Sequence, residues 1–395
     1  MDDLYDVLII GGGPVGLCFA KSLSVLGLSV AIVEKQSRAA LENPPIDGRD
    51  VALTHLSVNI LKQLGVWQSI PAEAISIIRE ARVFNGTSSK FMGLGTFKRD
   101  QLAYIVSNHL IRAAAYAAIK EDPHIHFIES GTPQRFEPQA SHTDVVLSDG
   151  SSMRVKLVVA ADSRFSETRK KIGISIAMRD FGKVMVVCQM QHDLPHQGIA
   201  QECFLYNKTT LAALPLTGNR SSVIITVQPL EAEKIVKLPE VEFNHYVSEK
   251  LYNRLGAMRL DSERYAHPLM GVYPNAFVAQ RFALIGDAAV GMHPVTAHGF
   301  NFGLKGQHTL ARYIAGAMRS KKDIGEKGVL MRYQADHQRT TRLLYLFTNS
   351  IVSLYTNDSP PLKMVRKTLL HLANNITPLK SFIVSKLLAQ KRPVT

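Results

Sequence analysis

The spacing of apolar and polar positions predicts a chain that alternates between buried strands and amphipathic helices. The apolar run over 4–10 is typical of a strand covered on both faces. Helical spacing follows over 14–26, and a short strand over 29–33 completes a βαβ unit at the N-terminus. The same reasoning predicts strands over 145–147, 155–160 and 282–285, and helices over 51–64, 99–119 and 300–318.

The pattern changes between residues 178 and 227. Short β-type runs such as 183–190 and 222–227 alternate there with polar breaks, without helical spacing. We therefore expect a second, mainly antiparallel sheet that is inserted into the first domain.

A glycine-rich turn follows the first strand. Gly11, Gly13 and Gly16 have the spacing G-x-G-x-x-G, with Pro14 opening the helix. Such glycines permit a tight turn, close approach of a diphosphate and close helix–strand packing, while the helix N-terminus attracts negative charge. Glu34 ends the next strand, where it can accept hydrogen bonds from a ribose, and Lys35 follows it. This context predicts a bound dinucleotide, although NAD and FAD share the fingerprint.

A second segment links a strand to a helix start near residue 286. Asp287 after Gly286 can bind ribityl or ribose hydroxyls, and the amides of Gly299, Phe300 and Asn301 can face the N1–C2=O edge of a flavin. A capped helix after a buried strand is the alternative. The intervening residues that we consider for a catalytic role are His293, Pro294 and His298.

Two further segments offer candidate ligands. Asp162 ends a buried strand shortly before Arg169, so it is either a ligand at the sheet edge or a helix N-cap. Arg49, in Asp47-Gly48-Arg49, and Arg99 can each pair with cofactor phosphates or lie near the flavin. Each arginine can equally be a solvated charge at a helix end.

Taken in their order along the chain, the glycine fingerprint, the Asp47-Gly48-Arg49 loop with Arg99, the central Asp162 and the block from Gly286 to Asn301 together resemble the class A flavoprotein aromatic hydroxylases, which share the fold of p-hydroxybenzoate hydroxylase. Within that class the chain is most similar to the ubiquinone-biosynthesis hydroxylases, and the run from Gly286 to Asn301 resembles the branch called UbiM. The resemblance extends from about residue 5 to about residue 370. The chain departs from the usual pattern at Asp162-Ser163, where Asp-Gly is usual, and at Ala297-His298-Gly299, where Gly-Gln-Gly is common.

The resemblance implies FAD as the cofactor, contacted by Gly11, Gly13, Gly16, Glu34, Arg49, Arg99, Asp162 and Asp287. It also implies that one oxygen atom of O₂ is inserted, through a flavin C4a-hydroperoxide, into the ring of a lipophilic polyprenyl phenol or quinol. No second fingerprint occurs, so NAD(P)H is expected to visit as a transient reductant. His293 or His298 could shuttle the phenol proton, although a hydrogen-bonded loop histidine is the alternative.

We therefore expect a mixed α/β fold, with a Rossmann-type FAD-binding domain over 1–75, 96–178 and 274–330. The substrate domain would comprise 76–95 and 179–273, and 331–395 would form a helical C-terminal region. Two other functions stay open on this scaffold: a flavin reductase or oxidase acting on an isoprenoid, and a non-catalytic FAD-binding assembly subunit.

Charge and composition narrow the list of partners. The formal charge is +13, of which +7 lies in the acid-free segment 359–395, so we expect no nucleic-acid binding. Apolar residues recur there at helical spacing, which predicts either a basic helix on a membrane surface or a packed terminal helix.

The three cysteines and the histidines have no metal-ligand spacing, so no metal is expected. Without a signal peptide or an apolar spanning segment, we expect a cytoplasmic protein, with the inner-membrane surface or a ubiquinone-biosynthesis complex as a docking place. The sequence leaves the oligomeric state open.

Overall fold

The computed structural model describes residues 4–86, 91–94, 101–129, 132–205, 209–293 and 298–356. The strands are β1 (Leu4–Ile10), β2 (Val30–Val33), β3 (Asp50–Leu53), β4 (Ser76–Ile78), β5 (Glu80–Asn85), β6 (Phe91–Leu94), β7 (Ala103–Ser107), β8 (Ile125–Ile128), β9 (Pro133–Pro138), β10 (Thr143–Leu147), β11 (Ser152–Ala160), β12 (Ile176–His192), β13 (Ile199–Phe204), β14 (Thr210–Pro215), β15 (Arg220–Val227), β16 (Met258–Leu260), β17 (Tyr265–Pro274), β18 (Val278–Ala279) and β19 (Phe282–Leu284). The helices are α1 (Pro14–Ser24), α2 (Arg38–Glu42), α3 (His55–Gln63), α4 (Asn108–Ala117), α5 (Glu167–Lys171), α6 (Pro229–Lys237), α7 (Glu240–Lys250), α8 (Gly299–Arg319) and α9 (Lys327–Thr356), with short 3₁₀ turns η1 (Trp67–Ser69), η2 (Ala72–Ala74) and η3 (Gly286–Ala288).

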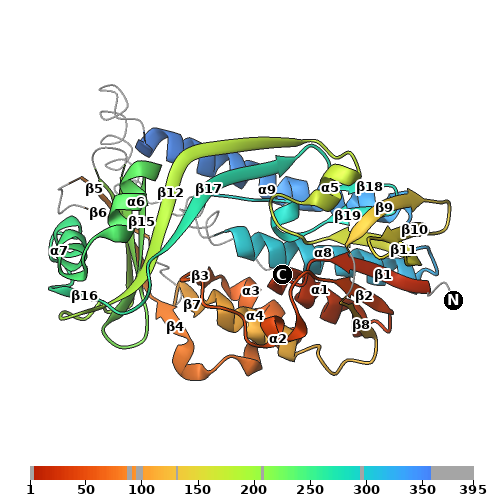
Figure 1. Ribbon diagram of the computed structural model, residues 1–395, viewed down its shortest axis with the longest axis horizontal. Helices are drawn as coiled ribbons and strands as arrows, with labels where there is room; N and C mark the ends of the chain where they lie inside the picture. The colour runs from red at the N-terminus through yellow and green to blue at the C-terminus, as the bar shows by residue number, and fades with distance from the viewer. Residues whose placement is uncertain are drawn as a thin grey trace, which may run out of the picture.

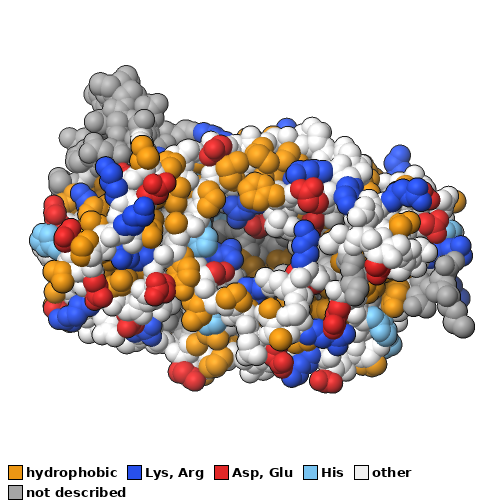
Figure 2. Space-filling view, in the orientation of Figure 1, with side chains coloured by type: hydrophobic (Ala, Val, Ile, Leu, Met, Phe, Trp, Pro, Cys, Tyr) orange, Lys and Arg blue, Asp and Glu red, His pale blue; other side chains and the backbone are white. Residues whose placement is uncertain are grey.

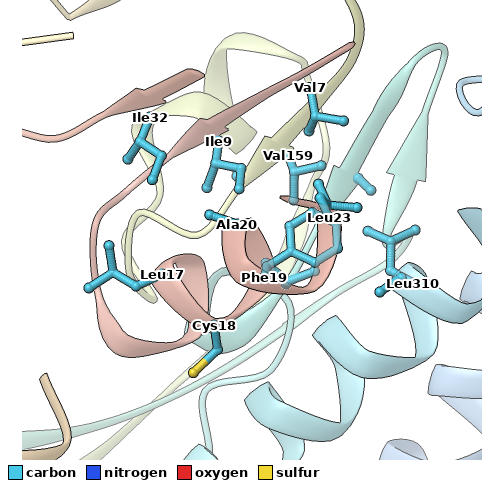
Figure 3. Packing of buried hydrophobic residues seen from close by; sticks show 14 of the residues in the cluster. Val7, Ile9, Leu17, Cys18, Phe19, Ala20, Leu23, Ile32, Val159 and Leu310 are labelled. Atoms are coloured by element: carbon cyan, nitrogen blue, oxygen red, sulfur yellow. The ribbon is translucent and has the colours of Figure 1, made fainter. Parts of the chain in front are cut away.

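The first sheet is built around the N-terminal strand. Its strands run in the order β18-β19-β11-β1-β2-β8, and β1 pairs in parallel with both β2 and β11. Strand β2 and the C-terminal parts of β1 and β11 are buried and apolar, as expected where helices cover a parallel sheet. Figure 3 shows Val7, Ile9 and Val159 of this sheet packing toward Phe19 and Leu23 of α1, with Leu310 of α8 beside them. This core fixes the carboxyl ends of β1, β11 and β19, where ligands of open α/β sheets bind.

The second sheet differs from the first in the direction of its strands and in the helices that cover it. Its strands follow the order β16-β12-β15-β14-β13-β5-β6, with β17 alongside β12, and all these pairs are antiparallel except β13 with β5. One face packs against α6 and α7 through a separate hydrophobic core. Figure 1 shows α6 and α7 at the outer end of the molecule and the long strands β12 and β17 running back toward the first sheet. The mixed α/β fold with a mainly antiparallel second sheet is therefore confirmed.

A small third sheet, which the sequence analysis did not anticipate, corrects two predicted helices. Strands β3 and β4 both pair antiparallel with β7. The segment 51–64 therefore begins as a strand and becomes helical only after Thr54, whose hydroxyl accepts a hydrogen bond from the Ser57 amide. The segment 99–119 likewise contains β7 before α4 begins at Asn108. Pairing with neighbouring strands outweighs the helical spacing of these residues, because β-branched side chains such as Ile105 and Val106 are fully buried in the sheet arrangement.

The C-terminal part of the described chain consists of two long helices. Helix α8 packs on α1, and α9 packs on α8 and beside β18. Tyr333 of α9 is fully buried and donates a hydrogen bond to the Leu284 carbonyl at 2.6 Å, which ties α9 to the edge of the first sheet. No helix within the described residues is both long enough and apolar enough to cross a bilayer. The basic tail predicted over 359–395 lies outside the described residues.

Candidate functional site

A single large cavity connects the carboxyl edge of the first sheet with the inner face of the second. Its volume is about 1530 Å³. Figure 2 shows the face of the molecule hollowed near its middle, with basic and hydrophobic side chains around the opening. The residues from the predicted set that line the cavity are Gly11, Gly13, Pro14, Glu34, Lys35, Arg49, Asp162, Gly286, Asp287, His293, His298, Gly299, Phe300 and Asn301. Residues from five separate segments of the sequence therefore meet around one space.

The three fingerprint glycines have different physical reasons for lacking a side chain. Gly11 has φ +111°, and a Cβ there would lie 2.5 Å from the Ala161 carbonyl oxygen. A Cβ on Gly16 would lie 2.1 Å from the Gly11 oxygen, so Gly16 permits packing within the turn and does not line the cavity. A Cβ on Gly13 would meet no atom within 4 Å. Gly13 thus borders open space at the start of α1, as a diphosphate cradle requires. The loop therefore fits a dinucleotide such as FAD.

Glu34 is held beside this turn. Its Oε2 accepts a hydrogen bond from the Gly12 amide at 2.5 Å, and its Oε1 accepts one from the Gln36 amide at 2.9 Å. These two bonds fix the carboxylate at the end of β2, at the rim of the cavity. A carboxylate positioned in this way can accept hydrogen bonds from a ribose diol, as the sequence predicts.

Asp162 lines the cavity and also contacts the start of α5, although the N-cap of that helix is Ser166 and not Asp162. Its Oδ2 accepts hydrogen bonds from the Thr168 amide at 3.2 Å and the Thr168 hydroxyl at 2.8 Å, which anchors the start of α5. Its Oδ1 is buried and has no partner among the described residues, although Asp162 lines the cavity. An unpartnered buried carboxylate oxygen at this place fits a cofactor that brings hydroxyl groups.

The residue after Asp162 explains one departure from the family pattern. Ser163 has φ +90°, a conformation that favours glycine. Serine therefore adopts here a backbone conformation that ordinarily belongs to glycine, at a cost of about 1 kcal/mol or more in local strain.

The turn over Gly286–Ala288 has Asp287 on its cavity side, while Arg169 contacts the same turn from the buried side. Asp287 Oδ2 forms an ion pair of 3.1 Å with Arg164 Nη2, and both residues line the cavity. Arg169 is fully buried and does not line it; its guanidinium donates to the carbonyls of Ala288 and Arg164, each at 3.0 Å. Arg169 thus supports the segments that carry Asp162 and Asp287. The sequence analysis gave Arg164 no role, because only the fold places it next to Asp287.

The N-terminus of α8 opens into the cavity. Gly299, Phe300 and Asn301 form its first turn, whose amides have no acceptor within the helix. The Asn301 side chain fixes this turn, because its Oδ1 accepts from the Thr54 amide at 2.9 Å and the Ser57 hydroxyl at 2.6 Å. Its Nδ2 donates to the Ala52 carbonyl at 2.8 Å. The helix start is therefore locked to β3 and α3, and its positive end favours an anionic group in the cavity.

Arg49 is positioned by its own loop. It pairs with Asp47 through Nη2 and Oδ2 at 2.6 Å, and Asn108 donates to the same oxygen at 2.8 Å. Burial alone would raise the pKa of Asp47, but these hydrogen bonds and the charge of Arg49 hold that pKa below its ordinary value. The pair keeps the guanidinium at the cavity wall.

The two histidines proposed for proton transfer are both buried at the cavity. Burial, together with the charge of Arg179, lowers the pKa of His293 to about 4, so the ring is neutral at pH 7. Its ring contacts Phe181 edge-on, with centroids 4.9 Å apart. A base with so low a pKa takes a phenol proton poorly, which disfavours proton transfer by His293. His298 immediately precedes α8 and packs against Phe302. Arg99 and Pro294, the other two candidates, lie outside the described residues.

The second sheet supplies the remaining wall of the cavity. Its lining residues are mostly apolar or hydroxyl-bearing: Ala81, Val83, Met92, Met185, Val187, Ala200, Phe204, Thr210, Ala212, Leu214, Ile224, Thr226, Pro268 and Leu269. Glu202 of β13 stands among them. Glu202 was missed, although it is the one charged residue in the strand sequence Ile-Ala-Gln-Glu-Cys-Phe, a signal that could have indicated it. The cavity can therefore hold a dinucleotide at one end and an apolar molecule at the other.

Comparisons with known proteins agree with this arrangement. The FAD binding domain family matches residues 4–345. Ubiquinone hydroxylase UbiM of Neisseria meningitidis is 40% identical over 97% of this chain and 84% of its own length. Ubiquinone hydroxylase UbiL of Rhodospirillum rubrum is 31% identical over 96% of this chain and 88% of its own length. The crystal structure of p-nitrophenol 4-monooxygenase PnpA from Pseudomonas putida superimposes with a TM-score of 0.78 at 17% identity, covering 99% of this chain and all of that one, which shows a shared fold. The chain therefore belongs to the FAD binding domain family, in the branch of FAD-dependent monooxygenases that contains the ubiquinone hydroxylases UbiM and UbiL.

Proposed function

We propose that this protein is an FAD-dependent monooxygenase that hydroxylates the aromatic ring of a polyprenylated ubiquinone precursor, with NAD(P)H as reductant and O₂ as oxidant. The single observation that carries the proposal is the continuous cavity between the fingerprint glycines and the apolar face of the second sheet. The relatives named ubiquinone hydroxylases support the ring of a quinone precursor as the substrate class.

Bound FAD would supply the redox chemistry, accepting electrons from NAD(P)H and transferring one oxygen atom of O₂. The chain's own residues would bind, orient and enclose the reactants. We propose that the cavity-lining glycines, Glu34, Asp162 and Asp287 hold the cofactor, with Lys35 and Arg49 beside it. The start of α8 would stabilise negative charge on the reduced ring. The apolar wall of the second sheet would exclude water and hold the lipophilic substrate. The division into FAD-binding, substrate and C-terminal regions that the sequence suggests is part of the same proposal.

Oxygen labelling tests this function directly. Under ¹⁸O₂, the FAD-loaded protein is expected to convert a prenylated phenol to a product one labelled oxygen heavier, with one NAD(P)H consumed per product. Mass spectrometry of the product and absorbance at 340 nm measure the two quantities. Oxidation of NAD(P)H without label in any product would instead support a reductase or oxidase. Bound FAD that NAD(P)H cannot reduce would support an assembly subunit.

We further propose that the protein works at a membrane surface, since its substrate is lipophilic and 359–395 carries seven basic residues and no acid. Removal of 359–395 is expected to lower co-sedimentation with vesicles containing anionic lipid by tenfold or more at low salt, with unchanged FAD content. Vesicles of neutral lipid are the control, because the basic charge gives no advantage there. Equal sedimentation of the full-length and shortened chains would contradict membrane binding through this segment.

A further inference from the structure

The inner face of the second sheet carries one carboxylate among the described residues that line the cavity. Side chains alternate between the two faces of a strand, so Ala200, Glu202 and Phe204 of β13 share the cavity face. Cys203 points the other way, into the core beneath α6 and α7. A charged group in this position is unusual, since the face is otherwise built to receive an apolar molecule.

Glu202 lines the same cavity as the first turn of α8. The Asn301 side chain holds the Ala52 carbonyl, and Ala52 packs in a cluster that includes Ala200. Glu202 is two residues beyond Ala200 on the same face, which corresponds to about 6–7 Å along a strand. A flat ring bound in this cavity between α8 and the sheet would therefore occupy the space that Glu202 faces.

Among the described residues, the neighbours of Glu202 on the cavity face are uncharged. The residues paired with it across the sheet are Val83 on β5 and Ala212 on β14. The Arg254 guanidinium, which contacts the Cys203 sulfur at 3.5 Å, is on the opposite face of the sheet. Burial among apolar groups raises the pKa of Glu202 to about 8. Its basicity is thus much closer to that of a phenol than an ordinary carboxylate's is, and a base of matched pKa transfers protons most efficiently.

We propose that Glu202 is a catalytic residue that accepts the hydrogen of the substrate's phenolic hydroxyl and so fixes which end of the substrate lies at the sheet. The inference rests on the proposed hydroxylase function and deepens it. An isoprenoid tail placed against Glu202 would leave the carboxyl desolvated without a hydrogen bond, whereas a hydroxyl would satisfy it. The hydroxyl end of the ring therefore belongs at Glu202, with the tail along the apolar part of the face.

In the proposed reaction Glu202 takes one proton from the substrate and later returns it. While a ring carbon forms its bond to the transferred oxygen atom, the electron pair of the phenolic O–H bond moves into the ring and Glu202 takes the proton. The hydrogen on the attacked carbon then leaves to solvent as a proton and aromaticity returns, while Glu202 gives its proton back to the phenolic oxygen. NAD(P)H supplies the two electrons that reduce the second atom of O₂ to water.

The test compares Glu202→Gln with the wild type on two probes, a phenol with a short isoprenoid tail and the methyl ether of the same phenol. Glutamine keeps the size of the side chain but cannot take a proton. Hydroxylation of the phenol is expected to fall about 100-fold or more, the usual range for loss of a general base. Slow hydroxylation of the ether is expected to change less than about threefold, because the ether has no proton to give. FAD content should match the wild type, which shows that the variant is folded and loaded with cofactor.

The pH profile gives a second readout that a structural role would not produce. Wild-type phenol hydroxylation should rise as the pH rises toward 8, where Glu202 loses its proton, and this rise should be absent in Glu202→Gln. Glu233→Gln, which removes an exposed carboxylate on α6, is the matched control and should behave as the wild type. Wild-type rates on the phenol in Glu202→Gln, or equal losses on phenol and ether, would overturn the role of Glu202 alone. Failure of the wild type to hydroxylate either probe would overturn the proposed function with it.

Discussion

Gly13→Ala is expected to yield a folded protein that no longer binds FAD. The backbone of Gly13, with φ −68° and ψ 168°, suits alanine, and the added Cβ would meet no protein atom within 4 Å. That Cβ would occupy the space through which a diphosphate approaches the start of α1. We expect the dissociation constant for FAD to rise by about 100-fold or more, roughly 2.7 kcal/mol. The absorbance at 450 nm of the purified protein and titration of the apoprotein with FAD measure it.

Gly16→Ala is the matched control, because its Cβ would collide with the Gly11 carbonyl oxygen inside the turn and not with the cofactor. This variant should lower the melting temperature of the apoprotein, whereas Gly13→Ala should leave it nearly unchanged. A yellow Gly13→Ala protein with wild-type FAD affinity would show that the diphosphate does not lie over this glycine.

The sequence was most informative where a single local pattern determines the structure. The strand at β1, the glycine turn and α1 form one contiguous unit, so their spacing sufficed to predict both the elements and the cofactor class. The same holds for the long helix α8, whose apolar spacing is sustained over many turns. In each case the partners that stabilise the element lie close by in the sequence or follow from the fold class.

Prediction from the sequence failed where the structure depends on contacts between residues that are far apart in the chain. The segments now seen as β3 and β7 were expected to be helical, because their strand character depends on pairing between residues about fifty positions apart. Arg169 was noted only as a close neighbour of Asp162 in the sequence, because its buried place behind the segments that carry Asp162 and Asp287 depends on the fold. Glu202 was not considered, because its significance arises from the apolar face around it and not from any motif.

Arg169→Met is expected to destabilise the protein and loosen both aspartate-bearing turns. Methionine retains the apolar stem but leaves the buried carbonyls of Arg164 and Ala288 without their donors. Each unsatisfied buried carbonyl costs about 1–3 kcal/mol, so we expect a loss of about 2–6 kcal/mol in the free energy of unfolding. Because Arg164 pairs with Asp287, displacement of these segments should also weaken FAD binding, by roughly tenfold.

Thermal unfolding of the apoprotein, followed by circular dichroism, measures the first effect, and FAD titration measures the second. Lys170→Met is the neighbouring control, since the Lys170 side chain is exposed and its ion pair with Glu167 is a surface one. It should lower the melting temperature little and leave FAD affinity unchanged. If Arg169→Met had the same melting temperature as Lys170→Met, the Arg169 guanidinium would not be needed for stability. The placement of Asp162 and Asp287 would then have to be attributed to the apolar core beneath them. A lower melting temperature without a change in FAD affinity would instead show that Arg169 stabilises the fold but does not influence cofactor binding, because the loss of its hydrogen bonds would then not displace Asp162 or Asp287.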